Sequence, residues 1–170
     1  YGVSVSRDGR WLQITTHEGT APRNEIYWAD LHISAPDAPQ LRRIFGDIDA
    51  QADFSVGRDG RVYVSTDYNS PRSRLCVTSP LDPSPENWVD VISEDPDAVL
   101  VGDVILDGPQ LAEPLIVAIH TRHTVSEMTV RKLATGDIVS TITLPGAGSV
   151  GAASEKPQGG HEFWFSYTDH

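Results

Sequence analysis

The chain has 170 residues, of which 39% are hydrophobic and 22% are charged, and its net charge is −11. This length suits one domain with a sizeable core, and the composition is typical of a soluble globular protein. The acidic balance argues against a nucleic-acid surface, which needs clustered Lys and Arg, and no run approaches the roughly 18 apolar residues of a membrane span.

Short β-type runs, each bounded by turn residues, follow one another along the whole chain. The first set is YGVSVS (1–6), WLQITT (11–16), EIYWADLHI (25–33) and LRRIF (41–45). The second set is ADFSVG (52–57), RVYVST (61–66), RLCVTS (74–79) and WVDVIS (88–93). The third set is VLVGDVIL (99–106), PLIVAIH (114–120), SEMTVRKL (126–133) and DIVSTITL (137–144). A fourth set begins with GSVGAAS (148–154) and EFWFSY (162–167).

The sets repeat with a fixed period. VSRDGRWLQITTHEG (5–19) and VGRDGRVYVSTDYNS (56–70) begin 51 residues apart. The second strands of the four sets begin near Trp11, Val62, Leu115 and Phe163, at spacings of 51, 53 and 48 residues. Four strands in a period of about 50 residues are typical of β-propeller blades. We therefore predict an all-β fold, a partial β-propeller of four-stranded antiparallel blades near 1–46, 49–94, 98–145 and 147–170, the last incomplete.

The predicted blades are too few to close a ring. Propellers typically have four to eight blades, and 170 residues hold about three and a half. Because a repeat needs neighbours on both sides to bury its faces, we expect either self-association through open blade edges or a larger parent protein.

The quoted repeats resemble the N-terminal propeller of the prolyl oligopeptidase family. SVSRDGRWLQITTHEGTAPRNEIYWADL (4–31) is similar to the family's V-S-x-D-G-R-x-L hairpin, its E-G loop and its strand ending in D-L. STDYNSPRSRLCVTSPLDPSPENWVDVISE (65–94) resembles T-N-x-x-(S/A)-P-x-x-R-L followed by D-P-x-x-x-x-W. KLATGDIVSTITLPGAGSVGAAS (132–154) resembles the L-A-T-G turn and the G-S-V strand. The matches are collinear over essentially the whole chain. Asp67 departs from them, because the family usually has Asn there.

The resemblance implies a two-part serine peptidase. In that family an α/β-hydrolase domain carries a Ser-Asp-His triad, and a seven-bladed propeller restricts access to short proline-containing peptides. This chain looks like the propeller from roughly the fourth blade into the seventh. It would then be a noncatalytic gating part that docks on the hydrolase domain, with no catalytic residue of its own. A sister peptidase, either oligopeptidase B-like or dipeptidyl peptidase-like, is an alternative parent.

The family comparison also suggests candidate site residues. His17, Glu18 and Thr20 match the loop that leaves the second strand and approaches the substrate pocket, where Thr20 takes a position that is often Cys. His17 would offer a pH-dependent positive charge to a peptide carboxylate. The alternative is an exit loop without substrate contact. Asn69, Arg72 and Arg74 lie in the matched S-P-x-x-R-L segment, where we expect them to brace blade against blade.

Other motifs favour structural interpretations. AGSVG (147–151) approaches a G-x-S-x-G nucleophile elbow, but Pro157 leaves no room for the helix that must follow it. His120 and His123 are three apart, which places them on opposite faces of a strand, and no third ligand is near, so we predict no metal site. Cys76 allows neither an intrachain disulfide nor a cysteine zinc site and is interpreted as a small buried hydrophobe.

We therefore expect no cofactor, no nucleic-acid partner and no membrane partner, and short peptides as the parent's substrates. No charged n-region with an apolar h-region opens the chain. We expect a cytoplasmic location, with secretion of the parent as the alternative. A self-associating propeller scaffold without a peptidase partner is the competing function, since two copies of about three and a half blades sum to seven.

Overall fold

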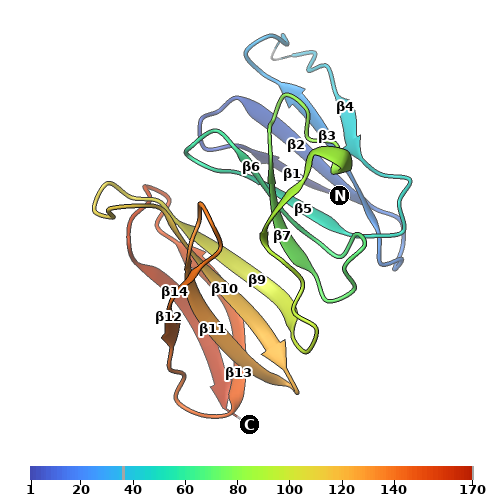
Figure 1. The fold of residues 1–170 in the computed structure, drawn as a ribbon. Coiled ribbons are helices and arrows are strands. Elements are labelled where there is room, and N and C mark those ends of the chain that lie inside the picture. The colour runs from blue at the N-terminus through green and yellow to red at the C-terminus, as the bar shows by residue number, and fades with distance from the viewer. Residues whose placement is uncertain (36, 170) are drawn as a thin grey trace. The chain divides into compact units, whose positions relative to one another are not determined.

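The computed structural model describes residues 1–35 and 37–169, and their regular structure is almost entirely β-strand (Figure 1). Within those residues the one helix is a single 3₁₀ turn, Pro85–Asn87. No helix in this part of the chain has the length and apolar character that spanning a membrane requires.

The strands form antiparallel meanders, in which neighbours in sequence are neighbours in the sheet. We call the four sheets blades 1 to 4. Blade 1 comprises β1 (Gly2–Val5), β2 (Trp11–His17), β3 (Asn24–Asp30) and β4 (Arg42–Phe45). Blade 2 comprises β5 (Ala52–Val56), β6 (Val62–Thr66), β7 (Arg74–Thr78) and β8 (Val89–Ile92). Blade 3 comprises β9 (Val99–Leu106), β10 (Leu115–Arg122), β11 (Val125–Lys132) and β12 (Ile138–Ile142). Blade 4 comprises β13 (Gly148–Glu155) and β14 (Phe163–Asp169).

The chain separates into two compact units. The first unit is Tyr1–Pro71 with Leu75–Asp90, and it holds blade 1 and most of blade 2. The second unit is Arg72–Arg74 with the chain from Val91 onward, and it holds blades 3 and 4.

The core of the first unit is aromatic. Alternate residues of β2 and β3 point to one face, so Trp11, Ile26 and Trp28 of blade 1 are all buried there. That face packs on blade 2, where the ring centroid of Phe54 lies 6.0 Å from that of Trp28. Phe45 stacks on Trp88 at 5.9 Å. Interlocked rings of this kind bury a large area and hold the two sheets in one arrangement.

The core of the second unit is mainly aliphatic. The buried members of the cluster are Val104, Leu106, Val117, Ile119 and Met128, all from blade 3. Half-buried residues of blade 4 cover them, among them the stacked pair Phe163 and Phe165 with centroids 5.7 Å apart. A polar contact adds to this packing, because the Val150 backbone N–H donates to the buried Ser126 hydroxyl at 2.9 Å.

The predicted all-β fold is confirmed, and most predicted strand boundaries differ from the observed ones by one or two residues, with the largest error at the end of β3. The strand expected over 25–33 ends at Asp30, which pairs with Trp11, the first residue of β2. One further hydrogen bond, from the Leu31 N–H to the Arg10 carbonyl at 2.7 Å, follows beyond the last pair. The Asp30 carboxylate then accepts the His32 N–H at 3.0 Å and starts a turn. The expected fourth blade, 147–170, includes His170, which lies outside the described residues.

Candidate functional site

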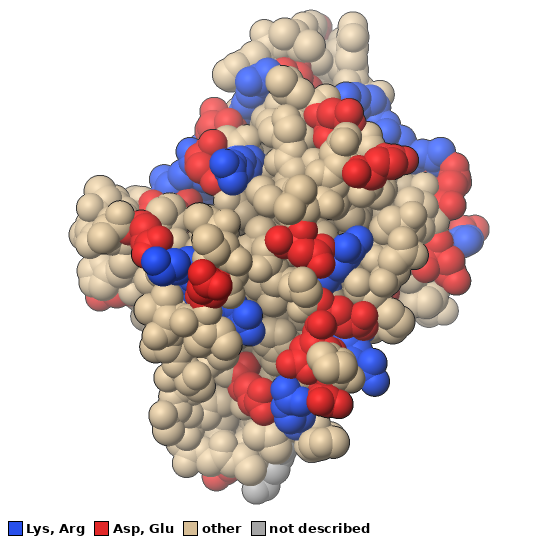
Figure 2. All heavy atoms as spheres, in the orientation of Figure 1, with Lys and Arg blue, Asp and Glu red and all other residues tan. Residues whose placement is uncertain are grey.

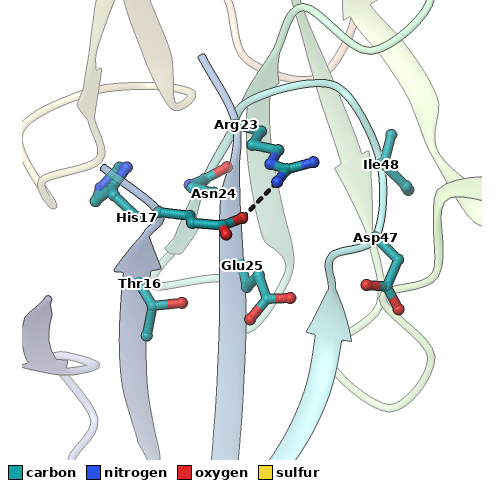
Figure 3. Close-up of a pocket in the computed structure, with 8 residues that line it drawn as sticks. Thr16, His17, Arg23, Asn24, Glu25, Asp47 and Ile48 are labelled. Carbon is teal, nitrogen blue, oxygen red and sulfur yellow. Dashed lines mark hydrogen bonds and ion pairs between the residues drawn. The ribbon is translucent and has the colours of Figure 1, made fainter. Parts of the chain in front are cut away.

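A pocket of about 330 Å³ lies in blade 1 where the β2–β3 loop meets the connection from β4 to β5 (Figure 3). The strands are joined here by a hairpin in which His17 pairs with Asn24. The intervening loop contains a tight turn, in which the Ala21 N–H donates to the Glu18 carbonyl at 3.2 Å. The lining residues are Thr16, His17, Glu18, Arg23, Asn24, Glu25, Asp47 and Ile48.

The three residues of the predicted substrate loop do not all reach the pocket. His17 and Glu18 line the pocket, whereas Thr20 is exposed at the turn and is not among the lining residues. In Figure 3 the His17 ring lies at the end of β2, on the far side of the pocket from Asp47 and Ile48. The structure therefore brings two of the three residues to one pocket.

The charges in and beside the pocket are paired. The Arg23 guanidinium donates to the Glu18 carboxylate across the loop, and the dashed line in Figure 3 marks this contact. Arg43 donates to Asp47 and, at 3.2 Å, to Glu25. The hydrogen bond from Arg43 to Asp47 is the main cause that raises the pKa of Arg43. Because these side chains are largely exposed, each pair contributes little to stability and stays available to a charged guest.

Tyr27 and Glu25 add a hydrogen bond beneath the ion pairs. The Tyr27 hydroxyl donates to the Glu25 carboxylate at 2.8 Å, which raises the pKa of Tyr27, with burial as the second cause. Glu25 is therefore held from two directions, by Tyr27 and by Arg43. These two hydrogen bonds orient the Glu25 carboxylate within the pocket.

Asn24 fixes the pocket to the neighbouring blade. Its side chain is buried, its amide N–H donates to the Ala52 carbonyl at 2.7 Å, and its amide oxygen accepts the Ala52 N–H at 2.9 Å. The side chain thus forms the two hydrogen bonds of a β-ladder pair between β3 and β5. This places the charged loop on a rigid support.

The groups that line the pocket are suited to binding a polar or charged partner. Its one hydroxyl belongs to Thr16, and its lining contains no serine or cysteine. Across residues 1–35 and 37–169, no group of three or more His, Cys, Asp and Glu side chains could hold a metal ion. The arrangement can orient a polar or charged partner through paired carboxylates and guanidinium groups.

Arg23, Asn24, Glu25 and Asp47 were missed from the sequence. The hairpin register offered a signal for Arg23, because the loop residues next to the pair His17–Asn24 are Glu18 and Arg23. Asp47 had no such signal, since it reaches the pocket from the connection after β4. Its place depends on how that connection folds back on blade 1.

The three predicted bracing residues lie in the β6–β7 connection and at the start of β7. Asn69 is exposed in a left-handed conformation (φ 55°). The Arg72 N–H donates to the Glu94 carboxylate at 2.6 Å, and the Arg72 carbonyl accepts the Leu100 N–H at 2.9 Å. Arg74 is half-buried as the first residue of β7. The Arg72 backbone thus links its own segment to Glu94, before β9, and to Leu100, within β9.

The remaining sequence candidates take structural positions. Ser149 lies inside β13, and the glycine before it is required by packing, because a Cβ on Gly148 would lie 2.2 Å from the Thr168 carbonyl. Cys76 is fully buried in the first core, as predicted. His120 is buried within β10, and burial lowers its pKa. His123 forms the β10–β11 turn with φ 47°.

On the face drawn in Figure 2, acidic and basic side chains are interspersed. The acidic excess of the chain is therefore spread over that face and does not form a single strongly charged field. Such a surface suits solubility more than long-range attraction of a polyanion.

The family model and the similar proteins that the chain matches all belong to the same family. A family model described as "Prolyl oligopeptidase, N-terminal beta-propeller domain" matches residues 1–169. A prolyl endopeptidase of Elizabethkingia miricola is 27% identical over 168 residues, which are 98% of this chain and 21% of that protein.

Solved structures agree with the family model. A prolyl endopeptidase from work on inter-domain dynamics in catalysis and specificity matches with a TM-score of 0.76 and 26% identity, over 92% of this chain and 21% of that one. Prolyl oligopeptidase B of Galerina marginata, bound to a 35-residue hydrolysis and macrocyclization substrate, gives a TM-score of 0.80 at 21% identity, over 97% of this chain and 22% of that one. This chain spans about a fifth of the length of these relatives.

Proposed function

The chain belongs to the family of prolyl oligopeptidase N-terminal β-propeller domains, and on this premise we propose that it is a noncatalytic gating part of a serine peptidase that cleaves short proline-containing peptides. The observation that carries the proposal is the match of the family model to residues 1–169, a span built of antiparallel blades. Acyl-enzyme chemistry would belong to an α/β-hydrolase domain on which the propeller docks. The proposed location is the cytoplasm.

The proposed role of the charged pocket is to face that hydrolase domain and the incoming peptide. His17, Glu18 and Thr20 would lie closest to the substrate, and exposed ion pairs would exchange partners as the two domains close. Asn69, Arg72 and Arg74 would brace the blades. Support comes from the placement of His17 and Glu18 in one pocket that Asn24 anchors to blade 2.

A chimeric enzyme tests the gating role. The chain replaces the matched 168-residue segment of the Elizabethkingia miricola prolyl endopeptidase, and hydrolysis of a short blocked Gly-Pro substrate is compared with that of a long proline-containing peptide. We expect cleavage of the short substrate and exclusion of the long one. A chimera that cleaves both alike contradicts gating. One whose serine no longer reacts with a fluorophosphonate contradicts docking.

The same chimera tests the site. His17→Glu should raise KM about 2- to 5-fold for a peptide with a free carboxylate, as expected for an exposed charge pair. A peptide capped as an amide is the matched control and should be unaffected. An equal change in KM for both peptides, or no change for either, would show that His17 does not contact the substrate carboxylate.

A self-associating scaffold is the second candidate function. It is supported by exposed apolar side chains on β1, where Val3 is 59% exposed and Val5 is 53% exposed. Sedimentation at several concentrations separates the two functions, because the scaffold requires a dimer or larger assembly.

A further inference from the structure

The first strand of blade 1, β1, has a free edge. It lies at one side of its sheet, because the strand order is β1-β2-β3-β4. All four of its residues are exposed, and Val3 and Val5 are 59% and 53% exposed. A strand with one unpaired side offers a row of backbone N–H and C=O groups to another strand.

The hydrogen bonds of blade 1 show which backbone groups of β1 point outward. The Ser6 N–H donates to the Trp11 carbonyl at 2.9 Å, and these two residues follow the last pair of the β1–β2 ladder, Val5 with Leu12. The direction of the backbone groups alternates along an antiparallel strand. Even-numbered residues of β1 therefore face β2, and the N–H and C=O groups of Val3 and Val5 point to the free edge.

β1 also lacks the features that keep the first strands of the other blades from pairing. Sheet edges are protected by a charged side chain within the strand or by a β-bulge. β5 carries Asp53 and β9 carries Asp103, and the β9–β10 and β13–β14 ladders are each interrupted by a shift in register. The β1–β2 ladder is regular, and YGVSVS (1–6) contains neither a charged side chain nor a proline.

The outward groups of β1 match those of a second β1 in one antiparallel register. With a two-fold axis at Ser4, Val3 of each copy lies opposite Val5 of the other, and the two valines exchange both of their hydrogen bonds. A shift by one residue would set outward groups against inward ones. A shift by two would pair one valine with Tyr1 or Arg7, which lie outside the strand.

The side chains suit the same register. Val3 and Val5 share one face of the sheet, where they neighbour Ile14 and Leu12 of β2. Pairing would bring exposed valine against exposed valine, which is a favourable cross-strand contact. Ser4 would meet its own copy at the axis. Because a two-fold interface sets each side chain near its own copy, an uncharged strand suits a second copy of this chain better than β5 or β9 would.

We propose that β1 is a self-pairing edge, through which two copies of the chain join blade 1 to blade 1 in a continuous antiparallel sheet centred on Ser4. This pairing deepens the second candidate function, the self-associating scaffold, on which it rests, and it is independent of the gating role. The copies would meet strand to strand, and not by stacking blade faces to complete a ring.

Sedimentation equilibrium of the 170-residue chain measures the pairing. We expect a dimer with a dissociation constant on the order of 100 µM, because few residues pair and association has a large entropic cost. Val3→Lys brings two positive charges to the interface and should weaken the dimer at least about 10-fold. Ile138→Lys on β12 and Trp164→Lys on β14 are matched controls at other open edges, where these residues are 58% and 53% exposed, and should leave the dimer unchanged.

Proline variants test the direction of the backbone groups. Val3→Pro removes an N–H that points to the free edge and keeps the hydrogen bonds to β2. It should therefore abolish the dimer and leave the urea midpoint of the monomer unchanged, measured well below the dissociation constant. Ser4→Pro removes an N–H that faces β2, and it should lower that midpoint.

Disulfide crosslinking tests the register. Ser4→Cys places two thiols in a directly opposed pair without mutual hydrogen bonds, whose Cα separation of about 4.5 Å suits a disulfide. Oxidised glutathione, which takes up the two electrons and two protons of the thiols, should link this dimer. Val3→Cys faces Val5 of the other copy and should not crosslink. Cys76 is fully buried and does not compete.

Each failure has a separate meaning. A dimer that survives both Val3→Lys and Val3→Pro overturns the β1 interface and leaves the scaffold function standing. A chain that stays monomeric up to about 1 mM overturns both, whereas gating is measured by the chimeric enzyme alone. Crosslinking of Val3→Cys in place of Ser4→Cys overturns the register.

Discussion

The β1–β2 hairpin of blade 1 and the β5–β6 hairpin of blade 2 share a repeated sequence motif. Their turns are alike, but the residues that pack around them differ. In the first, Gly9 N–H donates to the Ser6 carbonyl at 2.8 Å, and in the second Gly60 N–H donates to the Gly57 carbonyl at 3.0 Å. Asp8 and Asp59 each accept the backbone N–H two residues on, at 3.1 and 3.0 Å. The turn is therefore determined by its own few residues.

The residues around the turn show what packing adds. Position 6 is Ser, whose hydroxyl accepts the Trp11 N–H at 2.9 Å. Its counterpart is Gly57, where a Cβ would lie 2.9 Å from the Tyr63 ring. Two residues into the next strand, Gln13 borders a cavity while its counterpart Val64 is fully buried. The repeat fixes the local conformation, and the neighbouring blade decides whether a position is core or pocket.

The largest expected effect comes from giving each of positions 13 and 64 the residue found at the other. Val64→Gln buries an amide among aromatic and aliphatic side chains and should lower the free energy of unfolding by about 3 kcal/mol. Gln13→Val removes one hydrogen bond to Trp28 and should cost about 1 kcal/mol. Urea unfolding measures both. Similar losses in the two variants would mean that the positions are not distinguished by packing.

Giving the β5–β6 turn the serine of the β1–β2 turn, by Gly57→Ser, should also lower the stability of the protein. Gly57→Ser places a Cβ 2.7 Å from the Asp59 carboxylate and 2.9 Å from the buried Tyr63 ring, at a cost of about 1–3 kcal/mol from overpacking. Thermal unfolding reports the loss. A neutral result would show that Tyr63 moves aside without cost.

The two turn glycines should lose equal amounts of stability when each is replaced by alanine, because the two turns have the same backbone conformation. Gly9 (φ 73°) and Gly60 (φ 76°) are both left-handed, and a Cβ would meet nothing within 4 Å at either position. Gly9→Ala and Gly60→Ala should each cost about 1 kcal/mol from backbone strain alone. Unequal losses in urea unfolding would indicate that the two turns are not equivalent.

The smallest expected effect concerns the titration of Asp8. Hydrogen bonds from the Ser6 hydroxyl and then from the Arg10 N–H lower the pKa of Asp8 below its ordinary value of 3.8. The ionised group therefore adds stability above that value, and the contribution is lost as the pH falls through the lowered pKa. In Ser6→Gly the pKa of Asp8 should rise toward 3.8, as measured by NMR titration of the carboxyl. An unchanged pKa would contradict the role of the Ser6 hydroxyl.

The sequence was sufficient where structure depends on local residues. The R-D-G-R turn and the 51-residue repeat predicted both hairpins and the propeller fold, since turn chemistry and strand alternation are local properties. The end of β3 was misjudged because Leu31, His32 and Ile33 continue a β-type pattern, whereas the ladder ends where β2 begins.

The two pockets depend on contacts that the sequence does not display. Asp47 and Glu25 share Arg43 only because the connection after β4 returns to blade 1. A second cavity, beside the β1–β2 turn, depends on Ser4 of one blade and Phe54 of the next. His17 and Glu18 were named as candidates from the family loop, but the partners that hold Glu18 and Glu25 required the folded chain.

The most direct test of a noncatalytic propeller is an activity assay on the purified 170-residue chain with a blocked Gly-Pro fluorogenic substrate. We expect no turnover above buffer at any concentration of the chain. Turnover that copurifies with the chain and disappears in Ser149→Ala would contradict it.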